Sequence, residues 1–405
     1  NFKSPSQKLD KSRMLILAIL MATAFRNMGL SIIDIGLPSF ILSLSGSLIS
    51  FGAVVGIFSV MQSLFQFPIA AGSDKYGRRP VILVGIIVYA IGTFLCYFSQ
   101  NIVQLIIFRA IQGIGAYTSI LQAMIGDLFG SGQHGRGMGY YSLALNIGYF
   151  GGLLLGGYIS GFLCFRSIFL INLILVILSA LFLISFFNKN KKEIDVKRKC
   201  KNYDEEKEDK FSLNKQILFN LFKNKNFSIT VFLNCIRWFI FGSIVVYLIW
   251  VLQVHFAQNE IISSYMLIVI VAVYVGFVIV ASKVLDKYGP RKMMLIGQIT
   301  VLIMAIPFLF QLTNLLWIFL ITASFMAMGL ALYDPAGNTL LLNVIEDKSP
   351  ELKGSGIGIN NALGFFFSSI SPMIICPLGS VYVFLPFYLL IGLVFIALIV
   401  TIKFV

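Results

Sequence analysis

Five arginine and aspartate side chains lie inside long apolar stretches of this 405-residue chain, where a charge is costly and is usually kept for a purpose. They are Arg26, Asp34, Arg109, Arg237 and Asp334. Among apolar residues, side chains of these types can bind a charged solute, carry protons or tie helices together. We therefore treat all five as candidate binding or proton-transfer residues.

The two carboxylates are the candidates for carrying protons. Asp34 follows Arg26 by about 12 Å along a helix, so the two side chains cannot pair directly. Asp34 could equally hydrate the mouth of a cavity. Asp334 directly precedes Pro335, which can kink a helix and free backbone carbonyls at that point.

A charged connection between two apolar stretches recurs later in the chain. Asp-Lys-Tyr-Gly occupies residues 74–77 and again 286–289, an offset near half the chain length that indicates an internal duplication. The first copy predicts a hydrated loop of about nine residues, 72–80, between antiparallel helices. Arg26 and Arg237 are separated by nearly the same offset, so we expect them to be symmetry mates facing each other across a cavity.

Composition indicates a membrane protein. The chain is 58% hydrophobic and 12% charged, with a mean hydropathy of +0.90, so it has too few polar residues to cover a soluble globule of this size. A bilayer core about 30 Å thick takes about 20 helical residues per crossing. Twelve apolar runs therefore predict an all-α membrane protein with twelve transmembrane helices. The runs cover residues 14–38, 49–71, 81–99, 102–125, 138–162, 166–187, 227–251, 262–282, 293–311, 315–343, 355–378 and 380–402.

Basic residues predict the orientation of these helices. With a cytoplasmic N-terminus, 27 of the 31 Lys and Arg residues fall in cytoplasmic segments. The other four are Arg26, Arg109, Arg166 and Arg237. The positive-inside rule therefore predicts a multi-pass protein of the cell membrane with both termini in the cytoplasm.

A long polar segment, 188–226, divides the chain into two halves. Its many Lys, Asn, Glu and Asp residues predict a cytoplasmic linker between two six-helix bundles, 1–187 and 227–405. The apolar residues within 211–225 fit a short amphipathic helix on the membrane surface as well as they fit a lead-in to the next helix.

The stretch from Gly72 to Pro80 resembles the loop 2–3 signature of the major facilitator superfamily, in which glycines, an acidic residue and basic residues recur at this spacing. The resemblance covers the whole chain and implies the major facilitator fold, with two pseudo-symmetric six-helix bundles. It also implies that Asp127 meets Arg78 at the cytoplasmic face. The residues of this gate latch are Gly72, Asp74, Gly77, Arg78, Arg79, Asp127, Asp286, Gly289 and Arg291.

The latch would act through the end of another helix. Asp74 lies on the same side of the membrane as the start of the run 355–378. The first N–H groups of a helix have no partners within it and form the positive end of its dipole. We therefore expect Asp74 to hold the inner gate closed by facing this N-terminus.

Two further motifs resemble parts of the same superfamily. Arg109 and Gln112 match its helix 4 motif, which implies a cavity role for Arg109 and makes Gln112 a further candidate binding residue. For Arg109, a structural tie to a helix carbonyl or to another helix is the alternative. The glycines of the run 138–162 resemble the antiporter motif of drug exporters, but Leu153 stands where that motif has proline. Small residues at this spacing also permit close helix packing. These packing glycines are Gly148, Gly152, Gly156 and Gly157.

The helix 1 signature of drug–proton antiporters is matched less well. The stretch 31–38 resembles it, yet the acidic residue of that signature comes about five positions before Asp34. Gly29 occupies that position in this chain.

The sequence offers no constellation for an enzyme. His134 and His255 lie in predicted loops on opposite sides of the membrane, without a nucleophile or a phosphate-binding glycine loop. The five cysteines show no metal-ligand spacing, and the basic residues form no nucleic-acid-reading motif. We expect no cofactor, no metal and no nucleic-acid partner.

Binding and movement of a solute are what these residues predict. We expect a monomeric secondary transporter working by alternating access, and the resemblance favours proton-coupled export of small drug-like or amphipathic molecules. An organic-anion exchanger or importer stays open, because Arg26 and Arg237 suit a phosphate or carboxylate. A non-transporting membrane receptor or scaffold also stays open, since fold alone does not fix function.

Overall fold

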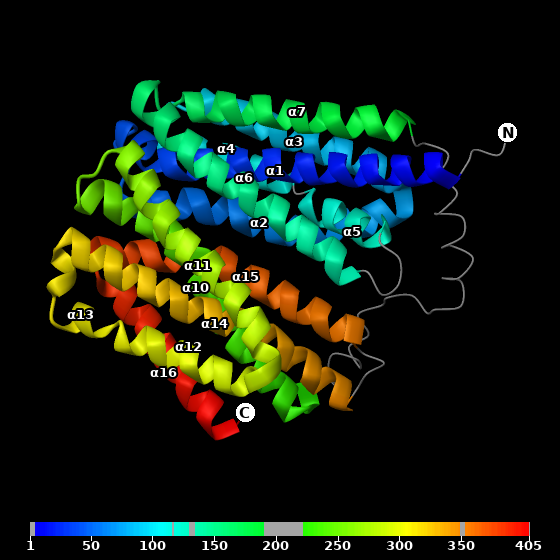
Figure 1. The fold of residues 1–405 in the computed structure, drawn as a ribbon. Coiled ribbons are helices and arrows are strands. Elements are labelled where there is room, and N and C mark those ends of the chain that lie inside the picture. The colour runs from blue at the N-terminus through cyan, green and yellow to red at the C-terminus, as the bar shows by residue number, and fades with distance from the viewer. Residues whose placement is uncertain (1–4, 116, 129–133, 190–221, 349–352, 405) are drawn as a thin grey trace. The chain divides into compact units, whose positions relative to one another are not determined.

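The computed structural model describes residues 5–115, 117–128, 134–189, 222–348 and 353–404, and these residues are almost entirely helical (Figure 1). No strand occurs within these ranges. The first half contains α1 (Pro5–Ser43), α2 (Leu48–Tyr76), α3 (Arg78–Tyr97), α4 (Ile102–Ile114), α5 (Thr118–Leu128), α6 (His134–Phe162) and α7 (Ser167–Lys189). The second half contains α10 (Lys225–Trp250), the π-helix η1 (Val251–His255), α11 (Glu260–Tyr288), α12 (Pro290–Ile303), α13 (Ile306–Leu309), the 3-10 helix η2 (Leu312–Asn314), α14 (Leu316–Lys348), α15 (Lys353–Val381) and α16 (Leu385–Phe404).

Eleven helices in the described ranges are long and apolar enough to cross a membrane. The run predicted at 102–125 is divided between α4 and α5. Gly115 follows the end of α4 at a close approach to α3, where an added Cβ would lie 2.6 Å from the carbonyl oxygen of Gly85. Together, α4 and α5 are consistent with the twelfth predicted crossing. The all-α membrane fold is confirmed.

The repeated charged connection is shorter than the loop expected from its charges. α2 continues through Asp74 to Tyr76, and only Gly77 separates it from α3. Likewise, only Gly289 separates α11 from α12. The φ angles of Gly77 and Gly289 are 101° and 77°, a region that glycine reaches without steric cost. The loop prediction was wrong because a helix can extend past the apolar core and carry charged residues at its end.

The helices form two compact units. The first unit comprises the described residues of Asn1–Gly36 and Leu64–Leu213, and the second comprises those of Leu37–Ser63 and Asn214–Val405. The unit boundaries therefore fall inside α1 and α2. The linker predicted at 188–226 lies mostly outside the described residues, and the domain limits drawn from the sequence stay a prediction.

In the first unit, α6 packs closely on α1 through glycines. An added Cβ at Gly148 would overlap the carbonyl oxygen of Ala24, and one at Gly152 would overlap Ser31 Oγ. A Cβ at Gly156 would overlap the side chain of Ile35. The stripe of small residues thus lets the two helices approach at nearly backbone distance.

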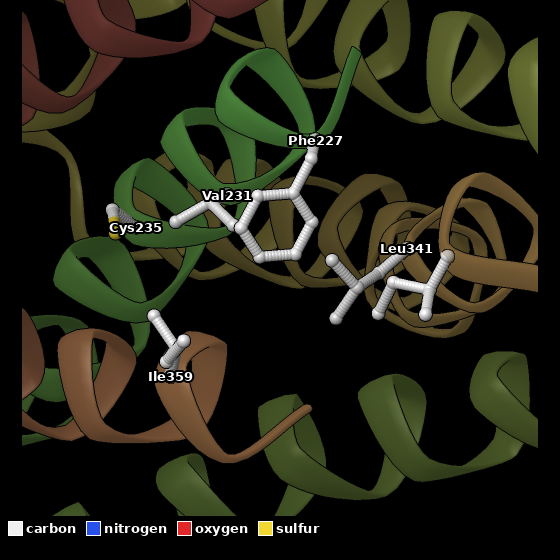
Figure 2. Packing of buried hydrophobic residues seen from close by; sticks show 6 residues of the cluster. Phe227, Val231, Cys235, Leu341 and Ile359 are labelled. Atoms are coloured by element: carbon white, nitrogen blue, oxygen red, sulfur yellow. The ribbon is translucent and has the colours of Figure 1, made fainter. Parts of the chain in front are cut away.

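In the second unit, α10 packs on α14 and α15. Figure 2 shows part of this contact, a cluster of buried apolar side chains. Its members are Phe227, Val231 and Cys235 from α10, Leu341 and Ile345 from α14, and Ile359 from α15. The cluster fixes the first turns of α10 against the other two helices.

Glycine contacts of the same kind recur in both units. In the first unit, Gly85 on α3 faces Gly115, with 3.6 Å between an added Cβ and the carbonyl oxygen of Gly115. In the second, an added Cβ on Gly297 of α12 would lie 2.5 Å from the carbonyl oxygen of Gly329 on α14. Gly297 follows Gly85 by the same offset that separates the two copies of the charged motif. The duplication therefore extends to helix packing.

The C-terminal end of α1 and the N-terminal part of α2 pack within the second unit. Phe51 on α2 lies 5.2 Å from Trp250 of α10, measured between ring centroids. Ser39 Oγ on α1 donates a hydrogen bond of 2.5 Å to Glu260 Oε1 at the start of α11. Ser369 Oγ on α15 donates to the carbonyl oxygen of Ser59, at 2.9 Å. These contacts join residues 37–63 to helices of the second half.

Candidate functional site

Arg26 lies inside the first unit, and no acidic partner for it occurs among the described residues. Its side chain is 2% exposed, and Nε and Nη2 are buried with no hydrogen-bond partner. The guanidinium carbon lies 5.7 Å from the ring centroid of Tyr89 on α3 and 5.4 Å from that of Tyr117, between α4 and α5. Cation–π attraction to these rings offsets part of the cost of burial but supplies no hydrogen-bond acceptor.

Asn172 on α7 closes one side of this cluster. Its Nδ2 donates to the hydroxyl of Tyr89 at 3.3 Å. Its Oδ1 fills the space that a Cβ on Gly29 would need. Gly29 is the position where the resembling antiporters carry an acid, so an acidic side chain could enter here only if Asn172 moved.

Arg109 on α4 is tied to α3 through Gln112. Arg109 is 1% exposed, and its Nη1 donates to Gln112 Oε1 at 2.7 Å. Gln112 Nε2 in turn donates to Thr93 Oγ1 at 2.8 Å. The structural tie that the sequence left open as an alternative is therefore present. Arg109 also attracts the half-buried Asp34 on α1 electrostatically.

Arg237, the expected symmetry mate of Arg26, has acceptors for both of its terminal nitrogens in the second unit. Its side chain is 1% exposed, and Nη1 contacts both the backbone oxygen of Asp334 and its Oδ1, the latter at 2.6 Å. Nη2 donates to Asn338 Oδ1 at 2.8 Å. The hydroxyl of Tyr274 on α11 donates to the second carboxylate oxygen of Asp334 at 3.1 Å. Asp334 keeps 32% of its side chain exposed, so the pair is only partly shielded from solvent.

Several polar neighbours of the buried charged residues were not predicted, because an uncharged polar side chain stands out less than a charge among apolar residues. Asn338 follows Asp334 by one helical turn, so helical spacing could have identified it. Asn234 precedes Arg237 on α10, and its Nδ2 donates to Asn360 Oδ1 on α15 at 3.0 Å. All of them are polar side chains within the predicted apolar runs, and this is the signal that could have identified them. The partners missed are Tyr89, Tyr117, Asn172, Asn234, Tyr274, Asn338 and Asn360.

The predicted latch residues lie at helix ends. Asp74, Asp127 and Asp286 belong to α2, α5 and α11, but the contacts of their side chains are outside what the structure describes. The latch therefore stays a prediction. Arg291 has a visible role, because its Nη2 donates to the carbonyl oxygen of Ile402 at 3.1 Å and so joins α12 to α16. Gly157 is buried in α6 beside the packing glycines.

The chain has charged groups buried in apolar helices, and its two halves are related. These features are typical of membrane transporters built from repeated helix bundles. The model of the Major Facilitator Superfamily matches residues 19–372, and the chain belongs to this family. It is a multi-pass membrane protein.

Curated relatives match parts of the chain. Multidrug resistance protein 3 of Bacillus subtilis is 30% identical over 185 residues, which are 45% of this chain and 36% of that protein. An uncharacterized transporter of Buchnera aphidicola is 29% identical over 168 residues, 41% of this chain and 43% of the relative. The match thus spans less than half the length of either relative.

Solved structures support the fold over nearly the whole chain. The nucleoside transporter NupG is 16% identical, with a TM-score of 0.69, over 96% of this chain and 98% of NupG. An inward-facing bacterial homologue of the human lysosomal transporter Spinster, in its occupied form, is 15% identical, with a TM-score of 0.71, over 94% of this chain and 83% of the homologue. At these identities the likeness concerns the fold.

Proposed function

We propose that this protein is a secondary active transporter that exports small drug-like or amphipathic organic molecules by alternating access, in exchange for protons. The observation that carries the proposal is the ion pair of Arg237 and Asp334 inside apolar helices, with Asp334 still partly accessible. Intramembrane charges are expensive and mark solute or proton pathways. A carboxylate that is both held by a guanidinium and open to solvent suits a step in which the solute replaces one partner of the ion pair.

The names of the relatives favour export of drug-like molecules. Multidrug resistance protein 3 and multidrug transporter protein MdtP, both of Bacillus subtilis, are each 30% identical to this chain over the matched segments. Those segments cover only 36% and 34% of the two proteins. Export of drug-like molecules by this chain is therefore part of the proposal. A transport role, with no catalysed reaction, accounts for the buried residues described above.

The proposed membrane location and orientation rest on the distribution of basic residues. We place both termini in the cytoplasm and the helices in the cell membrane, because the basic residues concentrate on one predicted side. Protons and a small solute are the proposed partners, and the proposed working form is a monomer. The polar linker at 188–226 would join two bundles without entering the bilayer.

The alternative of an organic-anion exchanger with paired arginines is less favoured. That mechanism needs two free guanidinium groups, whereas Arg237 is bound to Asp334 and Asn338. Of the two arginines, Arg26 keeps the chemistry that such a site requires. A single anion-binding arginine is compatible with the proposed exporter.

Solute flux in proteoliposomes tests the proposed function. Fluorescent amphipathic molecules of cationic, neutral and anionic type would be offered to liposomes with and without a pH gradient, and protein-free liposomes would serve as the control. We expect at least one molecule to be moved against its gradient only when the pH gradient is present. Absence of protein-dependent movement for every type would instead support the receptor or scaffold alternative.

A further inference from the structure

We propose that Arg26 is the centre of an anion-binding site within the first unit, built by α1, α3 and Tyr117. The site would take one singly charged anionic group, such as a carboxylate. The existence of the site is independent of transport. The further statement that its occupant is the anionic group of the transported solute rests on the proposed function.

The cluster around Arg26 has an excess of hydrogen-bond donors. Arg26 Nε and Nη2 and the hydroxyl of Tyr117 are all buried, and none makes a hydrogen bond of normal geometry in the structure. Asn172 Oδ1 is a buried acceptor without a partner in the same cluster, so the unpartnered donors outnumber it. Ser179 lies near the Tyr117 hydroxyl without a hydrogen bond of normal geometry between them, and its own hydroxyl donates to the carbonyl oxygen of Ala22 at 3.2 Å. Buried donors without acceptors are rare in folded proteins, and each one asks for an explanation such as an unseen ion. The three N–H groups on these two guanidinium nitrogens and the phenol O–H are donors that an anionic oxygen would satisfy.

In the part of the first unit that the structure describes, no counter-charge lies within reach of Arg26. Asp34 lies eight residues along the same helix, about 12 Å away, and therefore cannot meet Arg26 directly. Gly29, one turn from Arg26, offers no side chain, and Asn172 Oδ1 occupies the space beside it. The charge of Arg26 is therefore not neutralised from Gly29, a position where a carboxylate side chain could have paired with it.

Arg237 differs from Arg26 in the acceptors that surround its guanidinium. Arg237 is buried to the same degree, yet its guanidinium contacts the carboxylate of Asp334 and the amide oxygen of Asn338. Among the described residues, the chain therefore supplies acceptors to one buried arginine and withholds them from two nitrogens of the other. This difference points to an external acceptor for Arg26.

Two rings help to select the ligand. The ring centroids of Tyr89 and Tyr117 lie 5.7 Å and 5.4 Å from the guanidinium carbon of Arg26. Their aromatic faces would also contact an apolar group attached to the anion. A small aromatic carboxylate is therefore a better probe than a strongly hydrated inorganic ion.

Thermal unfolding of the purified full-length protein in detergent tests the site. The probes are sodium benzoate, its uncharged counterpart benzamide, and sodium chloride, all at constant ionic strength set with sodium sulfate. We expect benzoate to raise the unfolding midpoint of the unmodified protein and benzamide to leave it unchanged. The Arg26→Gln variant should lose the response to benzoate.

Two variants refine this test. Tyr117→Phe keeps the ring and removes the hydroxyl, so it should raise the apparent Kd for benzoate about fivefold, the effect of one net hydrogen bond. Arg26→Lys should retain part of the response because it keeps the charge. Lys292→Gln removes an exposed cation of the second unit and should respond as the unmodified protein does. If Arg26→Gln fails to fold, Tyr117→Phe and Arg26→Lys decide the question.

The outcomes separate the possible occupants. A benzoate response that depends on Arg26 supports the carboxylate of an organic solute. A response to chloride alone, again dependent on Arg26, supports the site with an inorganic ion as its resident. Equal responses of the unmodified protein and all Arg26 and Tyr117 variants would overturn the proposal. Transport of a neutral solute would then still stand, whereas anion binding without any transport would overturn the proposed function alone.

Discussion

Arg237 has a carboxylate partner, Asp334, whereas the equally buried Arg26 has none among the described residues. Arg26 and Arg237 were both predictable from sequence, because a charge stands out among apolar residues. Their different surroundings were not predictable, since Asp334 lies 97 residues from Arg237 and reaches it only through the packing of α10 against α14. Residue type identified the two arginines as candidate site residues, whereas tertiary contacts decided which of them has a carboxylate counter-ion.

Asp334→Asn should destabilise the protein, because Arg237 would keep its buried charge and lose its counter-ion. Removing one partner of a fully buried pair costs about 3–5 kcal/mol, and the partial exposure of Asp334 lowers the expected loss to about 1–3 kcal/mol. The free energy of unfolding in mixed detergent micelles measures the effect.

A double variant provides the control for this prediction. Asp334→Asn combined with Arg237→Gln removes both charges, so its loss should be clearly smaller than the sum of the two single losses. Strictly additive losses would show that the two side chains do not stabilise each other in solution.

At the scale of elements, the sequence predicted helices better than it predicted their ends and breaks. Apolar runs located the crossings in the described ranges because a bilayer imposes a length on them. The turn at Gly77 was predicted as a loop, since charge reports hydration and does not report backbone conformation. The division between α4 and α5 was also missed, because it depends on the approach of Gly115 to α3.

The glycine stripe of α6 gives a prediction with a matched control one residue away. Gly152→Ala should lower the unfolding free energy by about 1–3 kcal/mol, because the new Cβ would overlap Ser31 Oγ and the α1 backbone at Met28. At Gly151 the nearest atom to a Cβ is the flexible end of Met28, at 3.2 Å. Gly151→Ala should therefore change stability little. Comparable unfolding curves for the two variants would contradict the assigned packing.

The contact of α2 with α15 gives a prediction about motion. A Cβ on Gly52 would lie 2.6 Å from Cys376 Cβ, closer than the roughly 3.8 Å of a disulfide, so a small shift apart would allow Gly52→Cys to bond with Cys376. If this contact has to part during alternating access, oxidation should block transport and a reductant should restore it. Mass spectrometry of the linked peptides measures the bond.

The control for this cross-link is the same variant with Cys376→Ser. It should transport equally well before and after oxidation, because the partner thiol is absent. Full transport by a completely cross-linked protein would mean that α2 and α15 stay together throughout the cycle.

At the scale of the whole molecule, the duplication was readable because it preserves spacing. The charged motifs, the buried arginines and the glycine contacts recur at nearly the same offset along the chain. The membership of residues 37–63 in the second unit was not readable, since it arises from contacts with helices of the other half of the sequence, as between Phe51 and Trp250. A repeat can be detected from the spacing of residues in the sequence, whereas the grouping of helices into units depends on tertiary contacts.

Proton coupling is a property of the whole molecule, and two carboxylates compete for it. Asp334 is held in a direct ion pair by Arg237, whereas no ion pair of Asp34 occurs in the described part of the chain. We therefore expect Asp34→Asn to abolish accumulation driven by a pH gradient while solute exchange at equal pH continues. Asp334→Asn should slow both processes, because it also disturbs the packing around Arg237.

The measurement is solute movement in proteoliposomes under the two conditions, with each variant reconstituted to the same protein density. Loss of accumulation with preserved exchange separates coupling from binding, since exchange requires only that the solute site can face each side in turn. If both variants still concentrate the solute under a pH gradient, neither carboxylate carries the coupled proton. The coupling would then have to use a group outside this pair or an ion other than the proton.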